Sequence, residues 1–240
     1  MRAMTKMEGE AIIELKDVWK TYHMGEVQVH AVRGVSFKIK KGEFVAITGA
    51  SGSGKSTMMH LVGCLDNPSH GSVILDGRNI SSMSESRLAE VRGRKIGFIF
   101  QQFNLIPNLS ALENVMLPIE FQDEPDGEMK ERAKKLLDMV GLKDRMRHKS
   151  AELSGGQAQR VAIARSLAND PEIILADEPT GNLDSRTGEY IINFLSSLHK
   201  KEGKTVIMVT HDMGLIQFAE RIIKLKDGKV EEDTYNTKKR

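Results

Sequence analysis

A glycine-rich stretch of eight residues has the composition and spacing of a phosphate-binding loop. It reads Gly49-Ala50-Ser51-Gly52-Ser53-Gly54-Lys55-Ser56 and matches the pattern GxxxxGK[ST]. The β-rich run from Phe44 to Thr48 precedes it, and the segment from Lys55 to Leu65, which can be helical, follows it. A strand, a loop and a helix in this order aim backbone N–H groups and the positive end of a helix dipole at dense negative charge. This context favours a nucleotide-binding loop over a glycine-rich turn with a solvated lysine.

The end of this loop supplies the groups that would contact a nucleoside triphosphate and its metal ion. We expect Lys55 to reach the β and γ phosphates and to stabilise charge there. The Ser56 hydroxyl is expected to bind Mg²⁺. We assign Thr57, the next residue in the chain, to the same nucleotide site.

Two adjacent acids, Asp177 and Glu178, follow the apolar run from Ile173 to Ala176. In a parallel sheet the ligand crevice lies at the carboxyl ends of the strands. Adjacent side chains point to different sides, so Asp177 can hold Mg²⁺ through water while Glu178 accepts a proton from an attacking water molecule. The alternative is the solvated start of a loop, which the nearby phosphate loop makes less favoured.

The phosphate loop and the paired acids occur together in several enzyme classes, among them kinases, GTPases, helicases and transport ATPases. A third motif distinguishes between these classes. Leu153-Ser154-Gly155-Gly156-Gln157 precedes an apolar helical pattern, so Ser154 is predicted as a helix N-cap with two glycine N–H groups beside it. This is a second candidate anion site. It lies far from Lys55 in the sequence, and a second copy of the chain could bring it to the same nucleotide.

With all three motifs, the chain resembles the ATP-binding cassette family, the nucleotide-binding subunits of ABC transporters, over nearly its whole length. The resemblance implies an Mg²⁺-dependent ATPase that forms a head-to-tail homodimer around two ATP molecules, each held between one phosphate loop and Ser154 to Gln157 of the other copy. It also implies that Tyr22 stacks on adenine, that Gln101 contacts Mg²⁺ and water, and that His211 senses the γ phosphate. Leu183-Asp184 resembles the family's dimer-contact loop.

The residues themselves support these last assignments unequally. Tyr22 could instead be a half-buried tyrosine at a strand end. Gln101 is chosen over Gln102 because it directly follows the strand-like run from Ile96 to Phe100. His211 follows an apolar strand pattern that should end at the same sheet edge as Glu178, whereas most of the other histidines are expected at the surface.

A finer resemblance links the chain to the ATPases of lipoprotein-release and macrolide-efflux systems. It rests on Phe100 to Pro107, on Leu112-Glu113-Asn114-Val115 and Leu117-Pro118, and on Gly63-Cys64-Leu65-Asp66. Those ATPases partner an integral-membrane protein that extrudes or extracts substrates. One departure is Ala158, which stands after Gln157 where many relatives have glutamine. We expect little effect, because it lies outside the phosphate-contacting stretch.

Alternating strand and helix patterns predict an α/β fold with a P-loop NTPase core and a mostly parallel sheet. The predicted core strands are Phe44 to Thr48, Ile96 to Phe100, Glu172 to Ala176, Thr205 to Thr210 and Ile222 to Leu225, each covered on both faces. Fragments between Ile12 and Leu75 predict an added antiparallel layer. The segment from Phe103 to Ala151 lacks a convincing strand and predicts an inserted helical lobe, extended to about residues 103–168. We expect one domain over residues 1–240.

Composition limits the remaining classes of function. Lys and Arg total 35 against 33 Asp and Glu, a formal charge of +2, and we expect no nucleic-acid partner. A single cysteine and short apolar runs fit a cytoplasmic protein bound to the inner face of the membrane only through a partner subunit. Two alternatives are a non-transport ABC ATPase in DNA repair or translation, and a regulatory module. Long coiled coils or zinc modules, typical of the repair type, do not fit this chain.

Overall fold

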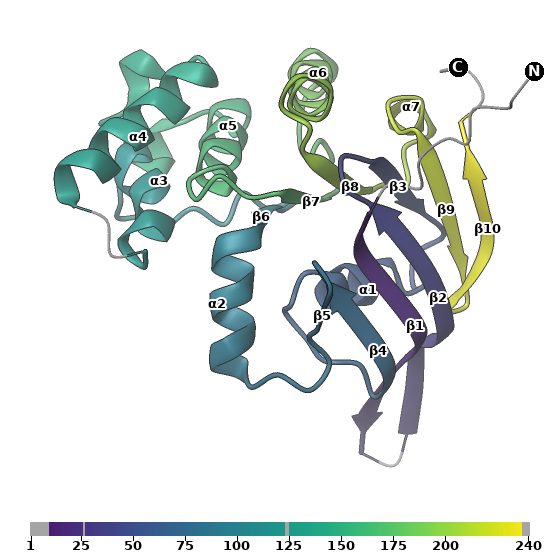
Figure 1. Ribbon diagram of the computed structural model, residues 1–240. Coiled ribbons are helices and arrows are strands. Elements are labelled where there is room, and N and C mark those ends of the chain that lie inside the picture. The colour runs from purple at the N-terminus through teal and green to yellow at the C-terminus, as the bar shows by residue number, and fades with distance from the viewer. Residues whose placement is uncertain (1–9, 26, 123–124, 237–240) are drawn as a thin grey trace, which may run out of the picture.

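Two β-sheets and a set of helices make up the fold (Figure 1). The computed structural model describes residues 10–25, 27–122 and 125–236. Within these residues one sheet has six strands in the order β10-β9-β3-β8-β7-β6, and the other has four strands in the order β2-β1-β4-β5. The α/β class and the division into two sheets are as predicted.

The six-stranded sheet is parallel except at β10, which pairs antiparallel with β9. Its strands are β3 (Phe44–Thr48), β6 (Ile96–Ile99), β7 (Ile173–Asp177), β8 (Thr205–Val209), β9 (Arg221–Lys226) and β10 (Lys229–Tyr235). Successive side chains of a strand point to opposite faces. Val45 and Ile47 therefore join one buried cluster while Phe44 and Ala46 join another on the opposite face. The prediction of core strands buried on both faces is confirmed for β3 and β8, whose residues are all buried.

The same prediction is wrong for Ile222 to Leu225. Burial alternates along β9, and Lys224 is exposed, with its Nζ 2.8 Å from a carboxylate oxygen of Glu231 on β10. The cause is the position of β9 next to the edge strand, where one face of the sheet is open to solvent. The short apolar run is therefore half-buried.

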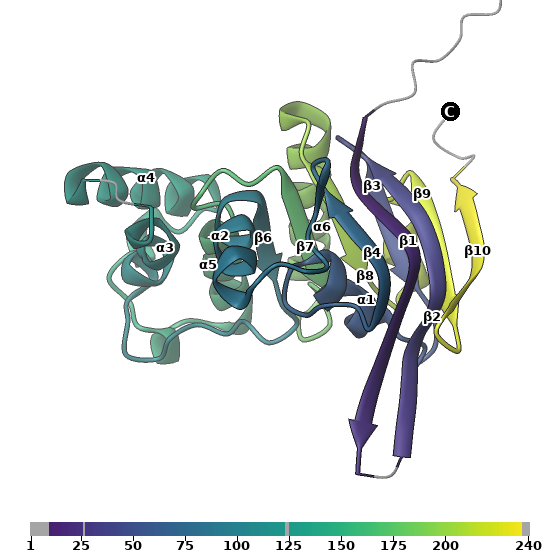
Figure 2. The ribbon, with the colours of Figure 1, turned by 60° about the horizontal axis from the view of Figure 1, so that its bottom comes forward.

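The antiparallel sheet consists of β1 (Ala11–Met24), β2 (Val27–Lys40), β4 (His70–Leu75) and β5 (Arg78–Asn79). The antiparallel layer predicted between Ile12 and Leu75 is confirmed, and the hairpin of β1 and β2, 14 residues each, projects beyond the rest of the molecule (Figure 2). Helix α1 (Lys55–Val62) is packed between the sheets, since its side chains share one buried cluster with strands of both. This packing places the start of α1 at the sheet edge.

The remaining elements are helical. They are α2 (Glu85–Lys95), α3 (Ala111–Glu120), α4 (Asp126–Met139), the 3₁₀ turns Lys143–Arg145 and Ser150–Glu152, α5 (Gly155–Ser166), α6 (Ser185–Glu202) and α7 (Met213–Ile216). Helices α3, α4 and α5 gather on the side away from the antiparallel sheet and form the predicted helical lobe (Figures 1 and 2). None of the helices in the described ranges combines the length and the hydropathy needed to cross a bilayer.

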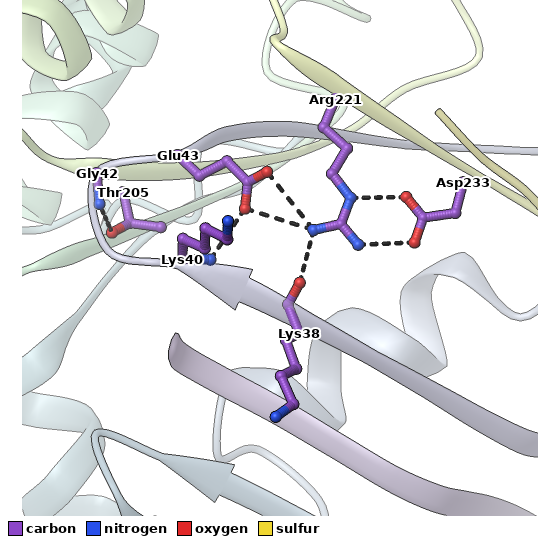
Figure 3. Close-up of polar contacts among 7 residues, drawn as sticks. All are labelled: Lys38, Lys40, Gly42, Glu43, Thr205, Arg221 and Asp233. Carbon is purple, nitrogen blue, oxygen red and sulfur yellow. Dashed lines mark hydrogen bonds and ion pairs between the residues drawn. The ribbon is translucent and has the colours of Figure 1, made fainter. Parts of the chain in front are cut away.

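Arg221 joins the two sheets at the base of the β9–β10 hairpin (Figure 3). Its guanidinium donates two hydrogen bonds of 2.6 Å to the carboxylate of Asp233 on β10. A third, also 2.6 Å, goes to the backbone oxygen of Lys38 on β2. Glu43 lies 3.5 Å from the same guanidinium, and both side chains are buried. The network fixes the hairpin against the antiparallel sheet.

Candidate nucleotide site

The glycine-rich loop links β3 to α1, as predicted, and close backbone contacts require two of its three glycines, Gly49 and Gly54. A Cβ atom on Gly49 would lie 2.3 Å from the oxygen of Leu225, and one on Gly54 would lie 2.4 Å from the oxygen of Ala31. Gly54 has φ of 99°, in the left-handed region that favours glycine. The loop therefore packs tightly against the backbone of β9 and β2.

The loop and the start of α1 together form an anion cradle. No side chain caps the N-terminus of α1, and its first turn carries no acidic residue. The Lys55 ammonium donates hydrogen bonds to the oxygens of Gly49 and Ala50, at 2.9 and 2.8 Å. Free helix N–H groups, a nest of glycine amides and one ammonium suit a polyphosphate.

A cavity of about 1010 Å³ opens beside this loop. Nearly all the predicted nucleotide and catalytic residues outside the Ser154 motif line it, and these are Tyr22, Gly49, Ala50, Ser51, Gly52, Gly54, Lys55, Ser56, Thr57, Gln101, Asp177, Glu178 and His211. Ser53 is the exception within the loop, because its side chain is buried behind it. The structure thus gathers predicted residues from five separate stretches of the chain around one cavity.

The two acids sit at the end of β7. Burial raises the pKa of Asp177 above its ordinary value, and the neighbouring Glu178 raises it further, while His60 and Lys55 act in the opposite direction. A half-buried carboxylate next to a second acid is a site where a cation is favoured. Glu178 has φ of 43°, rare for a residue with a side chain, and its N–H donates to the oxygen of Val209 at 2.9 Å.

This turn of the backbone directs Glu178 towards His211. The Nδ1 atom of His211 lies 2.7 Å from Oε1 of Glu178, and the glutamate side chain is only 20% exposed. The prediction that the two residues lie at the same sheet edge is confirmed. A carboxylate held in one orientation by an imidazole can accept a proton from water bound beside it.

The residues present fit a magnesium ion that is coordinated partly by the protein and partly by the phosphate oxygens of a bound nucleotide. The described part of the chain contains no cluster of three His, Cys, Asp or Glu side chains that could hold a metal by themselves. Ser56, Asp177 and Gln101 all line the cavity, and Mg²⁺ commonly takes one or two carboxylates together with water and substrate phosphates. Gln101 is packed closely, since a Cβ on Gly181 would lie 2.9 Å from its Nε2.

Tyr22 forms part of the cavity wall, and neighbouring side chains outside the cavity lining hold its ring in place. Its hydroxyl donates to Oδ2 of Asp66 at 3.1 Å, and Lys20 reaches the same carboxylate at 2.5 Å. The Lys20 ammonium is 5.1 Å from the centre of the ring. A half-buried ring fixed in this way offers a flat surface on which a base can stack.

Ser154 caps α5, as predicted, but its motif lies outside this cavity. The Ser154 hydroxyl accepts from the N–H of Gln157 at 3.3 Å, and Oε1 of Gln157 accepts from the N–H of Ser154 at 2.9 Å. A Cβ on Gly156 would lie 2.7 Å from Cγ2 of Thr187, whose N–H donates to Asp184. Within one chain, the motif therefore packs against the start of α6 and the Leu183-Asp184 loop rather than against the phosphate loop.

Two groups of cavity residues were missed from the sequence. Val29, His30, Ala31 and Arg33 of β2 line the cavity beside Tyr22, and so do Asp227 and Gly228 of the β9–β10 turn. An Asp-Gly pair between strand-like runs is a recognisable hairpin signal. No local signal, however, shows that this turn reaches a loop about 175 residues earlier in the chain.

Comparison with known proteins gives one family. The ABC transporter family model matches residues 32–181. An uncharacterized ABC transporter ATP-binding protein of Thermotoga maritima is 55% identical, with 92% of this chain and 94% of the relative covered. The macrolide export ATP-binding/permease protein MacB of Bdellovibrio bacteriovorus is 53% identical over 92% of this chain, which spans only 34% of MacB.

A solved structure supports the same assignment. The dimeric structure of the ATP-binding cassette MJ0796 of Methanocaldococcus jannaschii, in a post-hydrolysis state bound to ADP and Pi, matches with a TM-score of 0.88 and 52% identity. The match covers 93% of this chain and 98% of that structure. The resemblance to macrolide-efflux ATPases is confirmed. With its phosphate loop, its paired acids and these relatives, the chain belongs to the ABC transporter family, as an ATP-binding cassette that hydrolyses ATP.

Proposed function

We propose that two copies of this chain pair head to tail around two ATP molecules and drive an integral-membrane partner that exports or extracts a substrate. The chain would act at the cytoplasmic face of the membrane, held there by that partner. Support for the pairing comes from the dimeric structure of MJ0796, which is 52% identical. Support for export comes from relatives named macrolide export proteins, in which an ATP-binding part and a permease share one chain.

The position of Ser154 is the observation that carries this proposal. Ser154 and Gly155 are exposed at the N-terminus of α5, outside the nucleotide cavity of their own chain. Outside the stretch from Ser154 to Gln157, all predicted phosphate, metal and base contacts except Ser53 line that cavity. A helix N-terminus with two glycines, beside the loop that resembles a dimer contact, fits a role in a second copy's site.

The proposed chemistry is positioning and charge stabilisation. Lys55, the N-terminus of α1 and Ser154 of the other copy would stabilise charge on the γ phosphate. Glu178 would accept the proton of the attacking water while His211 keeps its carboxylate in place. Ser56, Asp177 and Gln101 would hold Mg²⁺, which neutralises charge on the phosphate oxygens. Tyr22 would carry the adenine ring on its face.

A second groove is suited to the membrane partner. It has a volume of about 730 Å³ and lies between α2, β6 and the helical lobe, with Phe98, Phe100, Pro118 and Phe121 in its lining. The Phe121 side chain is 77% exposed. An exposed aromatic side chain in a groove lined by further apolar side chains suits a protruding cytoplasmic segment of that partner.

Mixing two inactive variants tests the head-to-tail arrangement. Lys55→Ala should abolish ATP binding at its own loop, and Ser154→Arg should obstruct the site of the other copy. In a mixed dimer one composite site carries both defects and the other carries neither, so we expect hydrolysis to reappear on mixing. Hydrolysis that stays at the level of the separate variants would contradict the pairing.

A pair of surface variants tests the partner groove. Phe121→Asp should abolish co-purification with the detergent-extracted membrane protein identified from the same cells, because a charge replaces an apolar contact. Met139→Asp is the control, since Met139 is also exposed, at 49%, but lies on α4 outside the groove. Equal retention of the partner by both variants would contradict docking in this groove.

A further inference from the structure

The tip of the β9–β10 hairpin touches the phosphate loop through its backbone. The N–H of Gly228 donates to the oxygen of Ser53 at 3.1 Å. The oxygen of Gly228 accepts from the N–H of Arg33 on β2 at 2.8 Å. The turn is therefore hydrogen-bonded on one side to the phosphate loop and on the other to the antiparallel sheet.

Three backbone segments meet at the oxygen of Ala31. A Cβ atom on Gly228 would lie 2.9 Å from this oxygen, and one on Gly54 would lie 2.4 Å from it. The same Cβ on Gly228 would lie 3.2 Å from Cγ of Arg33. No space remains for a side chain here, so a substitution at Gly228 must displace the turn, β2 or the phosphate loop.

The hairpin is also held at its base. Arg221 bonds Asp233 across the two strands and the oxygen of Lys38 on β2 (Figure 3). Between base and tip, the oxygen of Leu225 on β9 fills the space next to Gly49. The first and last parts of the phosphate loop thus rest on one hairpin whose ends are both fixed.

We propose that Gly228 is a positioning residue for nucleotide binding: its turn keeps the phosphate loop in the conformation that aims its N–H groups at the phosphates. This inference rests on the proposed role of that loop. Gly228 acts through its backbone contacts with Ser53 and Ala31. Glu178 and His211, which would carry the chemical step, follow other strands, β7 and β8. Loss of the turn's support should therefore weaken ATP binding more than it slows the chemical step.

The chain contains its own control turn. Asp76-Gly77, between β4 and β5, has φ values of 48° and 72°, and Asp227-Gly228 has 49° and 79°. A Cβ on Gly77 would meet nothing within 4 Å. Alanine costs similar backbone strain at both positions. The two turns differ in the crowding of the Cβ against β2 and in the hydrogen bond from Gly228 to Ser53 of the phosphate loop. Asparagine tolerates this left-handed backbone conformation better than alanine does. Asn variants of both glycines therefore separate the effect of a crowded Cβ from the effect of backbone strain.

The test compares Gly228→Ala and Gly228→Asn with Gly77→Ala and Gly77→Asn. ATP affinity and steady-state hydrolysis are measured on the full chain, with thermal unfolding as the check of folding. Both Gly228 variants should raise Kd and KM for ATP about tenfold, the effect of weakening one hydrogen bond to a charged group. Their kcat at saturating ATP should stay close to that of the Gly77 variants. Equal ATP affinity in folded variants of the two turns would overturn the inference.

Lys55→Ala separates this inference from the function on which it rests. If Lys55→Ala binds ATP as tightly as the wild type, the role of the phosphate loop itself fails. If Lys55→Ala loses affinity while the Gly228 variants match their Gly77 controls, only the role of the hairpin fails.

Hydrogen exchange on the wild-type chain keeps the inference testable if the Gly228 variants do not fold. Added ADP should slow exchange of the amides at residues 226–230, because an ordered loop holds the Gly228 N–H on Ser53. The amides of the Asp76-Gly77 turn should not change. Unchanged exchange at residues 226–230 with bound ADP would overturn the inference.

Discussion

The Nδ1 atom of His211 lies 2.7 Å from Oε1 of Glu178, across the ends of two adjacent parallel strands. An ionised carboxylate only accepts hydrogen bonds, so Nδ1 of His211 is the donor in this pair. The pairing of Asp177 with Val209 brings the two loops together, and the left-handed backbone of Glu178 turns its side chain to the imidazole. The pair is thus fixed by strand register rather than by proximity in sequence.

Glu178→Gln should slow ATP turnover by about 10² or more, the usual contribution of a general base. Glutamine keeps the shape of the side chain but cannot accept the proton, so ATP affinity and dimer formation should be retained. Steady-state hydrolysis, ATP titration and size-exclusion chromatography with ATP measure the three properties. Near-normal hydrolysis by this variant would contradict the role of Glu178.

His211→Ala should also reduce kcat, by about tenfold or more, because Glu178 loses the donor that orients it. ATP affinity should change little, since His211 is not part of the phosphate cradle. The decisive measurement is the double variant with Glu178→Gln, which should be no slower than Glu178→Gln alone if the two residues act as a unit. Additive losses in the double variant would show that His211 acts independently of Glu178.

The parts of the site that are local in sequence could be predicted. A strand running into Gly49 to Ser56 has a characteristic pattern, and so has Ser154 before an apolar helix. The acids after Ile173 to Ala176 were placed correctly because strand ends in a parallel sheet share one edge. His211 could be added to that edge by the same reasoning, from the strand before it.

Other parts depend on contacts between distant segments. The positive φ of Glu178 and the closeness of Gly228 to the phosphate loop arise from strand register and crossover, which no short pattern specifies. The short strand β5 and the edge strand β10 were missed because polar residues dominate them. The half-exposure of β9 was missed because its apolar residues read as a buried run, although Lys224 interrupts it.

Asp177→Asn should stabilise the metal-free protein at neutral pH. Burial, and then the charge of Glu178, raises the pKa of Asp177 above its ordinary value of 3.8. A group with a raised folded-state pKa contributes most to stability below its unfolded pKa, and this contribution is lost as pH rises through the folded value. The variant should therefore have the higher Tm at pH 7, by about 2–4 °C for each kcal/mol gained.

This advantage of Asp177→Asn should shrink as the pH is lowered below neutral, because the folded wild-type protein takes up a proton at Asp177 more readily than the unfolded chain does. Thermal unfolding of both proteins from pH 4 to 8 measures it. Mg²⁺ with ATP should raise the Tm of the wild type more than that of the variant, because the variant lacks the carboxylate that holds the ion. A variant with a lower Tm than the wild type at pH 7 without metal would contradict this account of Asp177.

Arg221→Ala should lower the free energy of unfolding by about 3–5 kcal/mol, the cost of removing one partner from a buried ion pair. The change leaves Glu43, which is only 5% exposed, without its counter-charge and removes the bonds to Asp233 and to the oxygen of Lys38 (Figure 3). Arg221→Lys should recover only part of the loss, because one ammonium cannot replace a planar guanidinium that bonds three groups.

Denaturant unfolding measures these differences, and Lys224→Ala provides the control on the same strand. Lys224 is exposed and its pair with Glu231 is screened by solvent, so its removal should leave the unfolding midpoint near that of the wild type. Added salt should reduce any effect of Lys224→Ala more than that of Arg221→Ala, since buried charges are screened less. If both variants lost equally little stability, Arg221 would contribute no more to the free energy of unfolding than an exposed charge does. The base of the hairpin would then be held by its backbone pairing alone.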